Sequence, residues 1–283
     1  MLFSSNEVLA IVVLYKTAIA NSKTITTLTE SLAASDNYLD ILIYDNSPFK
    51  QDYSIPDNNR LRIHYVHDPS NGGVSKAYNY GASYAKEKTD KKWILLLDQD
   101  TSFSPDLISK FDEAYQNNTS LKLFVPILMT TDDIVFSPCK YYFRRGFPLK
   151  TVSAGVTFFK NISPVNSGML IKLDAFFAAG MYNEAIKLDF SDFQFIERFK
   201  KVQHHFFVID SVGYQDFSNH ETDIQKLNLR YAFFCEGAKR FERNNVGDDG
   251  KLFLVALMRA VTLALRTRST IYFSTFVNSY IKG

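Results

Sequence analysis

Two carboxylates follow directly on an apolar run in the stretch WILLLDQDT, which spans residues 93 to 101. Asp98 and Asp100 are separated by one residue, and carboxylate oxygens are the hard ligands that Mg²⁺ and Mn²⁺ prefer in proteins. Roughly one or two Asp-x-Asp triplets are expected by chance in a chain of this composition, so the triplet has little weight alone. Its meaning depends on the elements that position it.

A second acidic group lies in LDFSDFQFIERFKK, residues 188 to 201, which predicts a helix entered through Asp189 and Asp192. A carboxylate placed this way can act as the base for an incoming hydroxyl. The alternative is a favourable charge at a helix N-terminus, worth about 0.3–1 kcal/mol for each residue. Taken alone, this segment favours the alternative.

The first 125 residues alternate short apolar runs with longer amphipathic ones. Strands are predicted over residues 8–15, 38–45, 61–67, 93–98 and 121–126, and helices over 21–34, 74–88 and 105–117. This alternation indicates right-handed crossovers and an α/β fold, a mostly parallel sheet with helices on both faces. Residues 126–170 read as strands and loops, and the chain from about Ile224 onward reads as helical.

Three predicted strands end in polar clusters, at residues 45–47, 68–73 and 98–101. Ligands of such sheets bind beyond the carboxyl ends of the strands. Any one cluster is more often an ordinary turn, because Asp, Asn, Ser and Gly are turn formers. Three clusters at one edge favour a binding site that includes Asp98 and Asp100.

Composition narrows the class of protein. The chain has 283 residues, 46% of them hydrophobic, and a net charge of +2, which is too small to indicate a nucleic-acid partner. Cys139 and Cys235 are interpreted as core residues, and two thiols in a chain of this size fit a protein of a reducing compartment. The apolar run after Glu7 lacks the basic flank of a signal peptide and is interpreted as the first buried strand. The basic and aromatic stretch 140–150 is more often solvated surface than a binding lip.

The motifs VVLYK, IYDNS, NGGVSKAYNYGASYA, LLLDQD, NSGMLI and LDFSDFQFIERF, in this order, resemble a family 2 inverting glycosyltransferase of the GT-A fold, in its bacterial rhamnosyltransferase-like branch. The resemblance covers about residues 8–220. It implies a Rossmann-like, mostly parallel sheet in a catalytic domain over 1–223. The nucleotide-sugar half would span about 1–125 and the acceptor half about 126–223, followed by a helical, membrane-associating region over 224–283.

The resemblance also implies a donor site. Its residues would be Tyr15 and Asp45 near the nucleobase, Asn71, Gly72 and Gly73 near the ribose and diphosphate, Asp98 facing the ribose or a metal-bound water, and Ser167 and Gly168 beneath the sugar and diphosphate. Glycines let the backbone approach a ligand closely. Asn79 and Gly81 of the same motif are expected to pack within the protein.

The family pattern gives roles to the acidic motifs as well. Asp100 would ligate Mg²⁺ or Mn²⁺, with His220 touching the metal or the diphosphate, although a lone histidine is as often structural. Asp192, six residues before Arg198, would be the catalytic base, and Asp189 would bind the acceptor or orient Asp192. Gln194 stands where the family often has an acidic residue.

The following helix departs further from the branch. It keeps Arg230 and Tyr231 of the usual pattern, but Glu236 and Gly237 stand further along. This departure weakens the assignment to rhamnose.

The tail from residue 251 carries basic but no acidic residues, with Lys251, Arg259 and Arg266 on one stripe of an apolar helix. Such a helix fits an anionic membrane surface, and packing on the domain or a partner is nearly as well supported. The expected position is cytoplasmic and peripheral, at the inner face of the plasma membrane. The expected acceptor is a lipid-linked oligosaccharide of a bacterial surface polysaccharide.

Several functions stay open at the level of sequence. The favoured donor is dTDP-rhamnose, and a UDP-sugar such as UDP-galactofuranose or a UDP-hexose is the alternative within the same fold. An inactive nucleotide-binding scaffold of a polysaccharide assembly complex is the alternative from another class. The sequence contains no phosphate-binding loop of the Gly-x-x-x-x-Gly-Lys-Ser/Thr type, which excludes P-loop enzymes.

Overall fold

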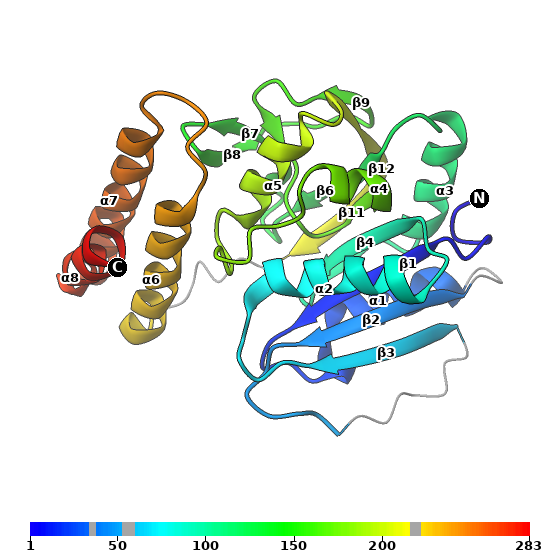
Figure 1. Ribbon diagram of the computed structural model, residues 1–283, viewed down its shortest axis with the longest axis horizontal. Helices are drawn as coiled ribbons and strands as arrows, with labels where there is room; N and C mark the ends of the chain where they lie inside the picture. Colours follow the sequence, from blue (N-terminus) through cyan, green and yellow to red (C-terminus); the bar gives the residue numbers. More distant parts are fainter. Residues whose placement is uncertain (34–37, 53–59, 216–221) are drawn as a thin grey trace.

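The computed structural model describes residues 1–33, 38–52, 60–215 and 222–283, and Figure 1 shows its α/β arrangement. Strands and helices alternate in the first half of the chain. They are β1 (Val8–Leu14), η1 (Ile19–Asn21), α1 (Lys23–Ala33), β2 (Leu39–Asp45), β3 (Leu61–His67), α2 (Gly73–Lys88), β4 (Trp93–Asp98), β5 (Thr101–Phe103) and α3 (Leu107–Asn117). The elements predicted for this half are confirmed, with small differences at their ends.

The second half builds strands first and helices afterwards. Its elements are β6 (Leu123–Met129), β7 (Val135–Tyr142), β8 (Arg145–Leu149), β9 (Gly155–Phe158), β10 (Ile162–Ser163), β11 (Met169–Lys172), α4 (Leu173–Ala178), α5 (Ser191–Phe199), β12 (His205–Gln215), α6 (Ile224–Arg240), α7 (Asp248–Thr267), α8 (Ile271–Phe276) and η2 (Val277–Lys282). The helices of the tail therefore begin at the residue predicted from the sequence.

One sheet runs through the molecule in the order β10-β7-β6-β11-β4-β1-β2-β3. Its half formed by β4, β1, β2 and β3 is parallel, as the alternation of strands and helices predicts. β11 enters antiparallel between β4 and β6, and β7 to β10 add further antiparallel pairs. The fold is a mixed α/β sheet whose parallel half is flanked by helices.

Strand β1 shows why both faces of the sheet are covered. Its alternate residues Ala10, Val12 and Leu14 enter one core, which α1 and α3 complete. Leu9, Ile11 and Val13 enter the other core, which includes residues of α2, α4 and α5. Burial of a branched aliphatic side chain contributes roughly 1.5–3 kcal/mol, so a polar substitution within this strand would destabilise the sheet.

The strand register brings the predicted polar ends to one edge. Leu14 pairs with Asp45, and Asp45 pairs with His67. On the other side of β1, Val13 pairs with Asp98. The carboxyl ends of four parallel strands therefore lie together, as expected for a ligand edge.

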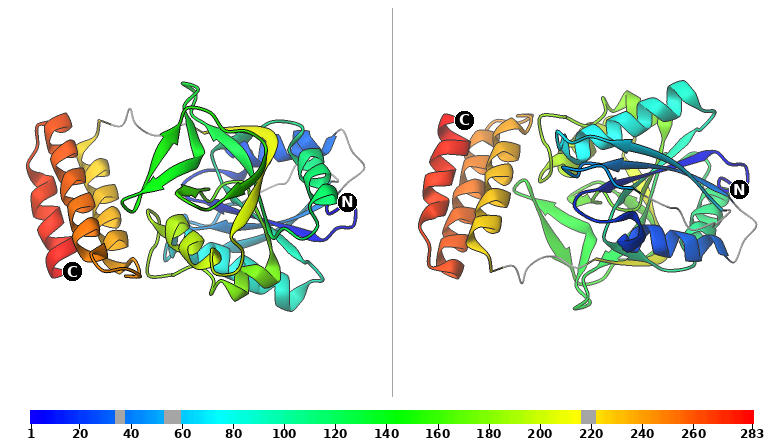
Figure 2. Two further views of the ribbon diagram at one scale, coloured as in Figure 1. Left: turned by 90° about the horizontal axis from the view of Figure 1, so that it is seen from above. Right: turned by 90° about the horizontal axis from the view of Figure 1, so that it is seen from below.

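The helices α6, α7 and α8 form a bundle at one end of the molecule, opposite the end where the N-terminus lies (Figure 2). The bundle has its own apolar core, which also includes Ile186 and Phe190 from the segment before α5. The first turn of α7 contributes Asp248, which is buried and bonded to the Arg144 guanidinium, with Nε at 3.2 Å from Oδ1. An ion pair thus ties the β7–β8 hairpin to the bundle.

Arg144 is an exception to the interpretation of residues 140–150 as solvated surface, which holds for the exposed Lys140 and Lys150. Its side chain is only 7% exposed and also lies over the ring of Phe241. The basic side chain is buried because the bundle supplies a carboxylate that sequence periodicity does not place beside it.

Candidate active site

The two carboxylates after β4 are held by side chains from separate elements. Asp98 Oδ1 accepts a hydrogen bond from the Tyr78 hydroxyl of α2 at 3.0 Å. Asp100 Oδ1 accepts one from Gln215 Nε2, at the end of β12, at 2.8 Å. Between them, Gln99 Oε1 accepts from the backbone N–H of Tyr15 at 2.7 Å, which ties the ends of β1 and β4 together. Neighbouring elements thus fix the Asp-x-Asp segment at the sheet edge.

Burial raises the pKa values of both carboxylates. Desolvation, followed by the charge of Asp100, raises the pKa of Asp98 to about 6. Desolvation also raises the pKa of Asp100, while Gln215, Lys23 and Arg230 oppose that effect. A bound cation would offset the repulsion between the two carboxylates.

The oxygen donors of Asp98 and Asp100 fit Mg²⁺ or Mn²⁺. No group of three or more His, Cys, Asp or Glu residues that could hold a metal occurs in the described part of the chain. Mg²⁺ commonly takes only one or two carboxylates and completes its shell with water and substrate phosphates, which fits this pair. His220, the other predicted metal contact, lies outside the described residues.

Asp45 lies at the same edge, at the end of β2, but it is fully buried. Its Oδ1 accepts from the backbone N–H of Ser47 at 2.9 Å, and its Oδ2 accepts from Gln51 Nε2 at 2.9 Å and from the Tyr65 hydroxyl at 2.6 Å. Tyr15, next to it, is 40% exposed. Contact of these residues with a nucleobase stays a prediction, and Asp45 also organises the loop after β2.

The loop at Asn71, Gly72 and Gly73 leads from β3 into α2. Asn71 and Gly73 have φ values of 49° and 80°, and a Cβ on Gly73 would lie 2.2 Å from the carbonyl oxygen of Lys187. Protein packing therefore already requires a glycine at position 73. Asn79 Nδ2 donates to the carbonyl oxygen of Tyr182 at 3.0 Å, so this residue packs within the protein as expected.

Ser167 and Gly168 precede β11 and lie beside the end of β4. The Ser167 hydroxyl is 2.8 Å from the Thr101 hydroxyl, and it accepts from the backbone N–H of Asp98 at 3.3 Å. Gly168 has φ of 84°, and a Cβ there would lie 2.5 Å from Pro126. Both residues lie beside the Asp98 segment, and their contact with a donor stays a prediction.

The second acidic pair is positioned by an unusual turn. Asp189 precedes Phe190, which has φ of 74° although it is not glycine, and α5 begins at Ser191. A residue held in this left-handed region costs about 1–3 kcal/mol. The Phe190 ring is buried against Phe234 of α6, with ring centroids 4.7 Å apart. The C-terminal bundle therefore stabilises the turn that carries Asp189 and Asp192.

Asp192 has the environment of a proton acceptor near neutral pH. Burial, with the charges of Asp189 and Asp98, raises its pKa to about 7, although its Oδ1 accepts from the backbone N–H of Phe193 at 2.7 Å. The charge of Asp98 thus acts on Asp192, and a chain of contacts through Tyr78, Tyr182 and Asn166 leads from Asp98 to Ser191, the residue before Asp192. The rings of Tyr78 and Tyr182 lie 5.5 Å apart in a tilted arrangement, and both residues experience the charges of Asp98 and Asp192.

Two motif residues near Asp192 face the protein rather than an open site. Arg198 donates to Glu242 with Nε at 3.0 Å and to the carbonyl oxygen of Met181 at 2.9 Å, so it anchors α5 to the loop and the bundle. Gln194 is buried, and its Oε1 accepts from Asn183 Nδ2 at 3.2 Å. Gln194, which stands where the family often has an acidic residue, thus makes a contact within the protein.

Sequence patterns missed the supporting residues. Gln215 could have been found by the same rule that singled out the other strand ends, because it is the last residue of β12. Gln99 lies between the two aspartates in the sequence, but its side chain bonds to Tyr15, 84 residues earlier in the chain. Tyr78 and Tyr182 carry no local signal, since their roles arise from packing between α2 and the segment after α4.

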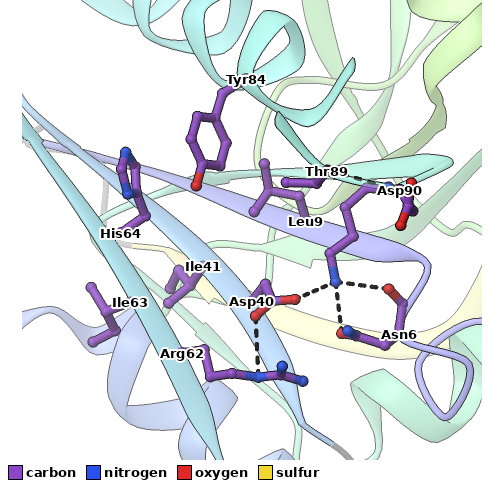
Figure 3. Close-up of a pocket in the computed structure, with 11 residues that line it drawn as sticks. Asn6, Leu9, Asp40, Ile41, Arg62, Ile63, His64, Tyr84, Thr89 and Asp90 are labelled. Carbon is purple, nitrogen blue, oxygen red and sulfur yellow. Dashed lines mark hydrogen bonds and ion pairs between the residues drawn. The ribbon is translucent and has the colours of Figure 1, made fainter. Parts of the chain in front are cut away.

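A cavity of about 570 Å³ lies elsewhere, at the amino ends of the parallel strands. Figure 3 shows Asp40 in this cavity with Arg62 beside it, and Arg62 Nε lies 3.2 Å from Asp40 Oδ1. The Lys91 ammonium bonds to Asp40 and to Asn6 Oδ1 and O. Since these three acceptors satisfy the Lys91 ammonium, we interpret the network as structural.

Comparison with known proteins shows which family and which relative this chain resembles. Residues 10–140 match the model of the family described as glycosyl transferase family 2. The dTDP-rhamnosyl transferase RfbF of Shigella flexneri is 29% identical over 132 residues, which are 46% of this chain and 44% of that protein. The match thus spans less than half the length of that relative.

The solved structure of S. aureus TarS 1-349 in complex with UDP-GlcNAc is similar across most of the chain. It aligns with a TM-score of 0.51 over 96% of this chain and 79% of that chain, at 13% sequence identity. At this identity the likeness concerns the fold alone.

Proposed function

Residues 10–140 belong to glycosyl transferase family 2, and from this premise we propose that the protein moves a sugar from a nucleotide diphosphate sugar to a saccharide acceptor with inversion. One observation carries the proposal. Asp98, at the end of β4, acts electrostatically on Asp192, at the start of α5, and burial raises the pKa of Asp192 to about 7. A cation-binding pair and a separate base are the two parts that such a transfer needs.

In the proposed reaction, Asp192 takes the proton from an acceptor hydroxyl. The hydroxyl oxygen forms a bond to the anomeric carbon from the face opposite the diphosphate, and the bond between that carbon and the diphosphate oxygen breaks. The diphosphate leaves with the electron pair. A base whose pKa lies near the working pH is efficient for this step, because it is ionised and still basic.

Asp100 and Asp98 would hold Mg²⁺ or Mn²⁺, which when bound supplies positive charge for the diphosphate leaving group. Gln215 keeps Asp100 in place through its 2.8 Å hydrogen bond. Tyr78 does the same for Asp98. The side chains of this chain therefore orient the carboxylates before any donor arrives.

Rhamnose is the favoured sugar and dTDP-rhamnose the favoured donor. The support is the 29% identity to a dTDP-rhamnosyl transferase over 132 residues. Galactofuranosyl or hexosyl transfer from a UDP-sugar is the alternative, and the similarity in fold to a protein that binds UDP-GlcNAc keeps it open.

A panel of nucleotide sugars tests the function and the donor together. Each donor is incubated with the protein and Mg²⁺, and thermal stabilisation and release of nucleoside diphosphate are measured with and without chelator. We expect dTDP-rhamnose to give the largest signal and chelator to remove it. Stabilisation by nucleotides without turnover of any donor would instead support an inactive scaffold, and turnover that chelator leaves intact would contradict the cation.

The C-terminal bundle supports a place at a membrane surface. Residues 250–283 contain lysines and arginines but no Asp or Glu. Apolar side chains on the outside of α7 and α8 are exposed, namely Phe253, Leu254, Met258, Leu265, Ile271 and Phe273. We propose that this face rests on an anionic leaflet at the inner face of the plasma membrane, where a lipid-linked oligosaccharide of a surface polysaccharide is the acceptor.

Among the helices of the described residues, none is long and apolar enough to cross a membrane. Sedimentation with vesicles tests the surface contact. Binding to vesicles with anionic lipid, its loss with zwitterionic lipid, and its reduction by Leu254→Glu and Met258→Glu are the expected results. Equal binding of the double variant would contradict the proposed face.

A further inference from the structure

The turn that carries Asp100 is held by a helix that contains none of the sequence motifs. Gln99 and Asp100 form this turn, between the end of β4 and the start of β5. The Thr24 hydroxyl, in the first turn of α1, lies 2.5 Å from the carbonyl oxygen of Asp98 and 2.9 Å from the carbonyl oxygen of Thr101. One side chain therefore contacts the backbone on both sides of the turn.

The same helix start holds the middle of the turn. The carbonyl oxygen of Gln99 accepts a hydrogen bond from the Ser22 hydroxyl at 2.8 Å and another from the backbone N–H of Thr24 at 3.4 Å. The first N–H groups of a helix have no partner within the helix, so a carbonyl oxygen placed there satisfies one of them. The start of α1 thus bonds to the backbone before, within and after the turn.

These contacts belong to a buried network of hydroxyl groups. Thr24 Oγ1 accepts from the backbone N–H of Thr101 at 3.2 Å, and the Thr101 hydroxyl lies 2.8 Å from the Ser167 hydroxyl. Ser22, Thr24 and Thr101 are 0% exposed, and Ser167 is 1% exposed. Burial of a hydroxyl is costly unless it is hydrogen-bonded, and each of these four has a partner. The network holds residues 98–101 from α1 and from the loop before β11.

The Thr24 hydroxyl does not serve its own helix. Thr26 and Thr27 donate to the carbonyl oxygens of Ser22 and Lys23, four residues earlier, as threonine commonly does within a helix. Thr24 Oγ1 bonds instead to carbonyl oxygens 74 and 77 residues away. The hydroxyl is therefore placed for the turn after β4 rather than for the helix.

The place of the Asp100 carboxylate depends on this backbone. Gln215 Nε2 donates to its Oδ1 at 2.8 Å, which orients the end of the side chain. The turn sets the position from which that side chain starts. Mg²⁺ requires nearly ideal octahedral ligands at about 2.0–2.1 Å, so a small displacement of one ligand lowers affinity. A shift of the turn would therefore weaken a cation site even where the Gln215 contact remains.

We propose that the start of α1 positions the cation site, through the hydroxyls of Thr24 and Ser22, which hold the turn so that the Asp100 carboxylate lies where Mg²⁺ or Mn²⁺ binds. This inference rests on the cation of the proposed function. Because Thr24 is fully buried, it acts through the turn and not by contact with a donor. Thr24 is a positioning residue, and its loss should lower cation affinity without changing the affinity for nucleotide in the absence of a cation.

The test measures Mn²⁺ binding to the full chain from the electron paramagnetic resonance signal of the free ion, first without nucleotide and then with nucleoside diphosphate. Thr24→Val keeps the shape of the side chain and removes the hydroxyl. We expect Thr24→Val to weaken Mn²⁺ binding by about 10–100-fold, as is typical when a partner that orients a metal ligand is lost. Thr24→Ser keeps the hydroxyl and should bind Mn²⁺ as the wild type does. Asp100→Asn gives the size of the complete loss.

Thr27→Val is the matched control. Thr27 belongs to the same helix, and its hydroxyl accepts from the backbone N–H of Phe103, beyond the turn. The substitution removes the same group and should leave Mn²⁺ affinity unchanged. Ser22→Ala is a milder second variant, because the Gln99 carbonyl oxygen keeps its bond from the N–H of Thr24. A several-fold loss of Mn²⁺ affinity is expected for it.

Equal Mn²⁺ affinity of the wild type and a folded Thr24→Val would overturn the inference. Thermal unfolding shows whether Thr24→Val is folded, and where it is not, unchanged affinity in Ser22→Ala overturns the inference instead. A loss of the same size in Thr27→Val, or a loss that Thr24→Ser shares, would also overturn it, because the cause would then be the packing of α1. Nucleotide affinity in the presence of chelator should stay at the wild-type value, and an equal loss there would count against a specific effect on the cation.

Turnover of nucleotide sugars by the same proteins separates this inference from the proposed function. Mn²⁺ binding that depends on Thr24, in a protein that transfers no sugar, would refute the proposed function while the positioning role stands. Sugar transfer that chelator leaves intact, in a protein that binds no Mn²⁺, would overturn the positioning role while the transfer stands.

Discussion

The two acidic pairs of this protein have the same chemistry but different supports. Asp98 and Asp100 follow a central parallel strand, and side chains from α2 and β12 hold their oxygens. Asp189 and Asp192 flank a left-handed Phe190, which the C-terminal bundle packs in place. The first pair belongs to the sheet and the second pair depends on contacts between the sheet domain and the bundle.

The difference in support accompanies a difference in charge environment. The pKa of Asp98 is about 6, raised by burial and by a second carboxylate that a cation would share. The pKa of Asp192 is about 7, raised by burial and by the charges of Asp189 and Asp98, with backbone N–H hydrogen bonds opposing them. Two similar residues are thus suited to different tasks, cation binding and proton uptake, by their surroundings.

The largest expected effect comes from removing the base alone. Asp192→Asn should lower the transfer rate by about 10²–10⁴-fold, which is the usual contribution of general base catalysis, and should leave donor affinity unchanged. Initial rates at saturating donor, with nucleotide affinity measured in parallel, check this. A variant with more than a tenth of the wild-type rate would show that the second pair has no such role.

The support of the first pair is tested by Gln215→Leu. Loss of the 2.8 Å hydrogen bond should weaken metal affinity or activity by about 10–100-fold, as is typical of residues that orient a metal ligand. The measurement is activity as a function of Mg²⁺ concentration. Gln203→Leu is the control, because Gln203 also forms hydrogen bonds but does not contact Asp98 or Asp100. Equal metal dependence of both variants would contradict the role of Gln215.

The pH dependence of transfer should follow the second pair. Asp192 acts as a base in its ionised form, so the rate should rise through pH 7 and level above it. With a pKa of about 7, the ionised fraction falls roughly tenfold between pH 8 and pH 6. The negative charges of Asp189 and Asp98 raise the pKa of Asp192. Asp189→Asn removes one of these charges, so we expect the pH profile of this variant to shift toward lower pH. A flat profile between pH 5.5 and 8 would contradict the assignment.

The smallest effect should come from loosening the bundle contact. Phe234→Leu removes the ring that packs on Phe190. We expect a several-fold rise in the acceptor KM with unchanged nucleotide affinity. Loss of ring packing at a partly buried site should lower the free energy of unfolding by about 1–2 kcal/mol. If nucleotide affinity falls instead, the two pairs do not have separate supports.

Periodicity and motif order predict much of the framework. The apolar run that ends in Asp98 becomes a central strand with both faces buried, because its neighbours on each side are equally apolar. The convergence of strand ends follows from parallel pairing, and it places Asp45 and Asp98 correctly at one edge. Local sequence is sufficient where the outcome depends on the length and spacing of apolar runs.

The supports of the site could not be predicted in this way. The hydrogen bond from Gln215 to Asp100 joins residues 115 positions apart, and the contact of Arg259 with Phe234 depends on how two helices dock. Left-handed geometry at Phe190 runs against local preference and is tolerated because its ring is buried. The requirement for Gly73 came from Lys187, which no local pattern connects with it.

Nucleoside diphosphate binding, measured by calorimetry with and without Mg²⁺ in Asp100→Asn and Asp192→Asn, tests the division between the two pairs most directly. The account predicts that Mg²⁺ strengthens binding in the wild type and in Asp192→Asn but has no effect in Asp100→Asn. Loss of the Mg²⁺ effect in Asp192→Asn, or its retention in Asp100→Asn, would contradict the separate roles of the strand-end pair and the helix-start pair.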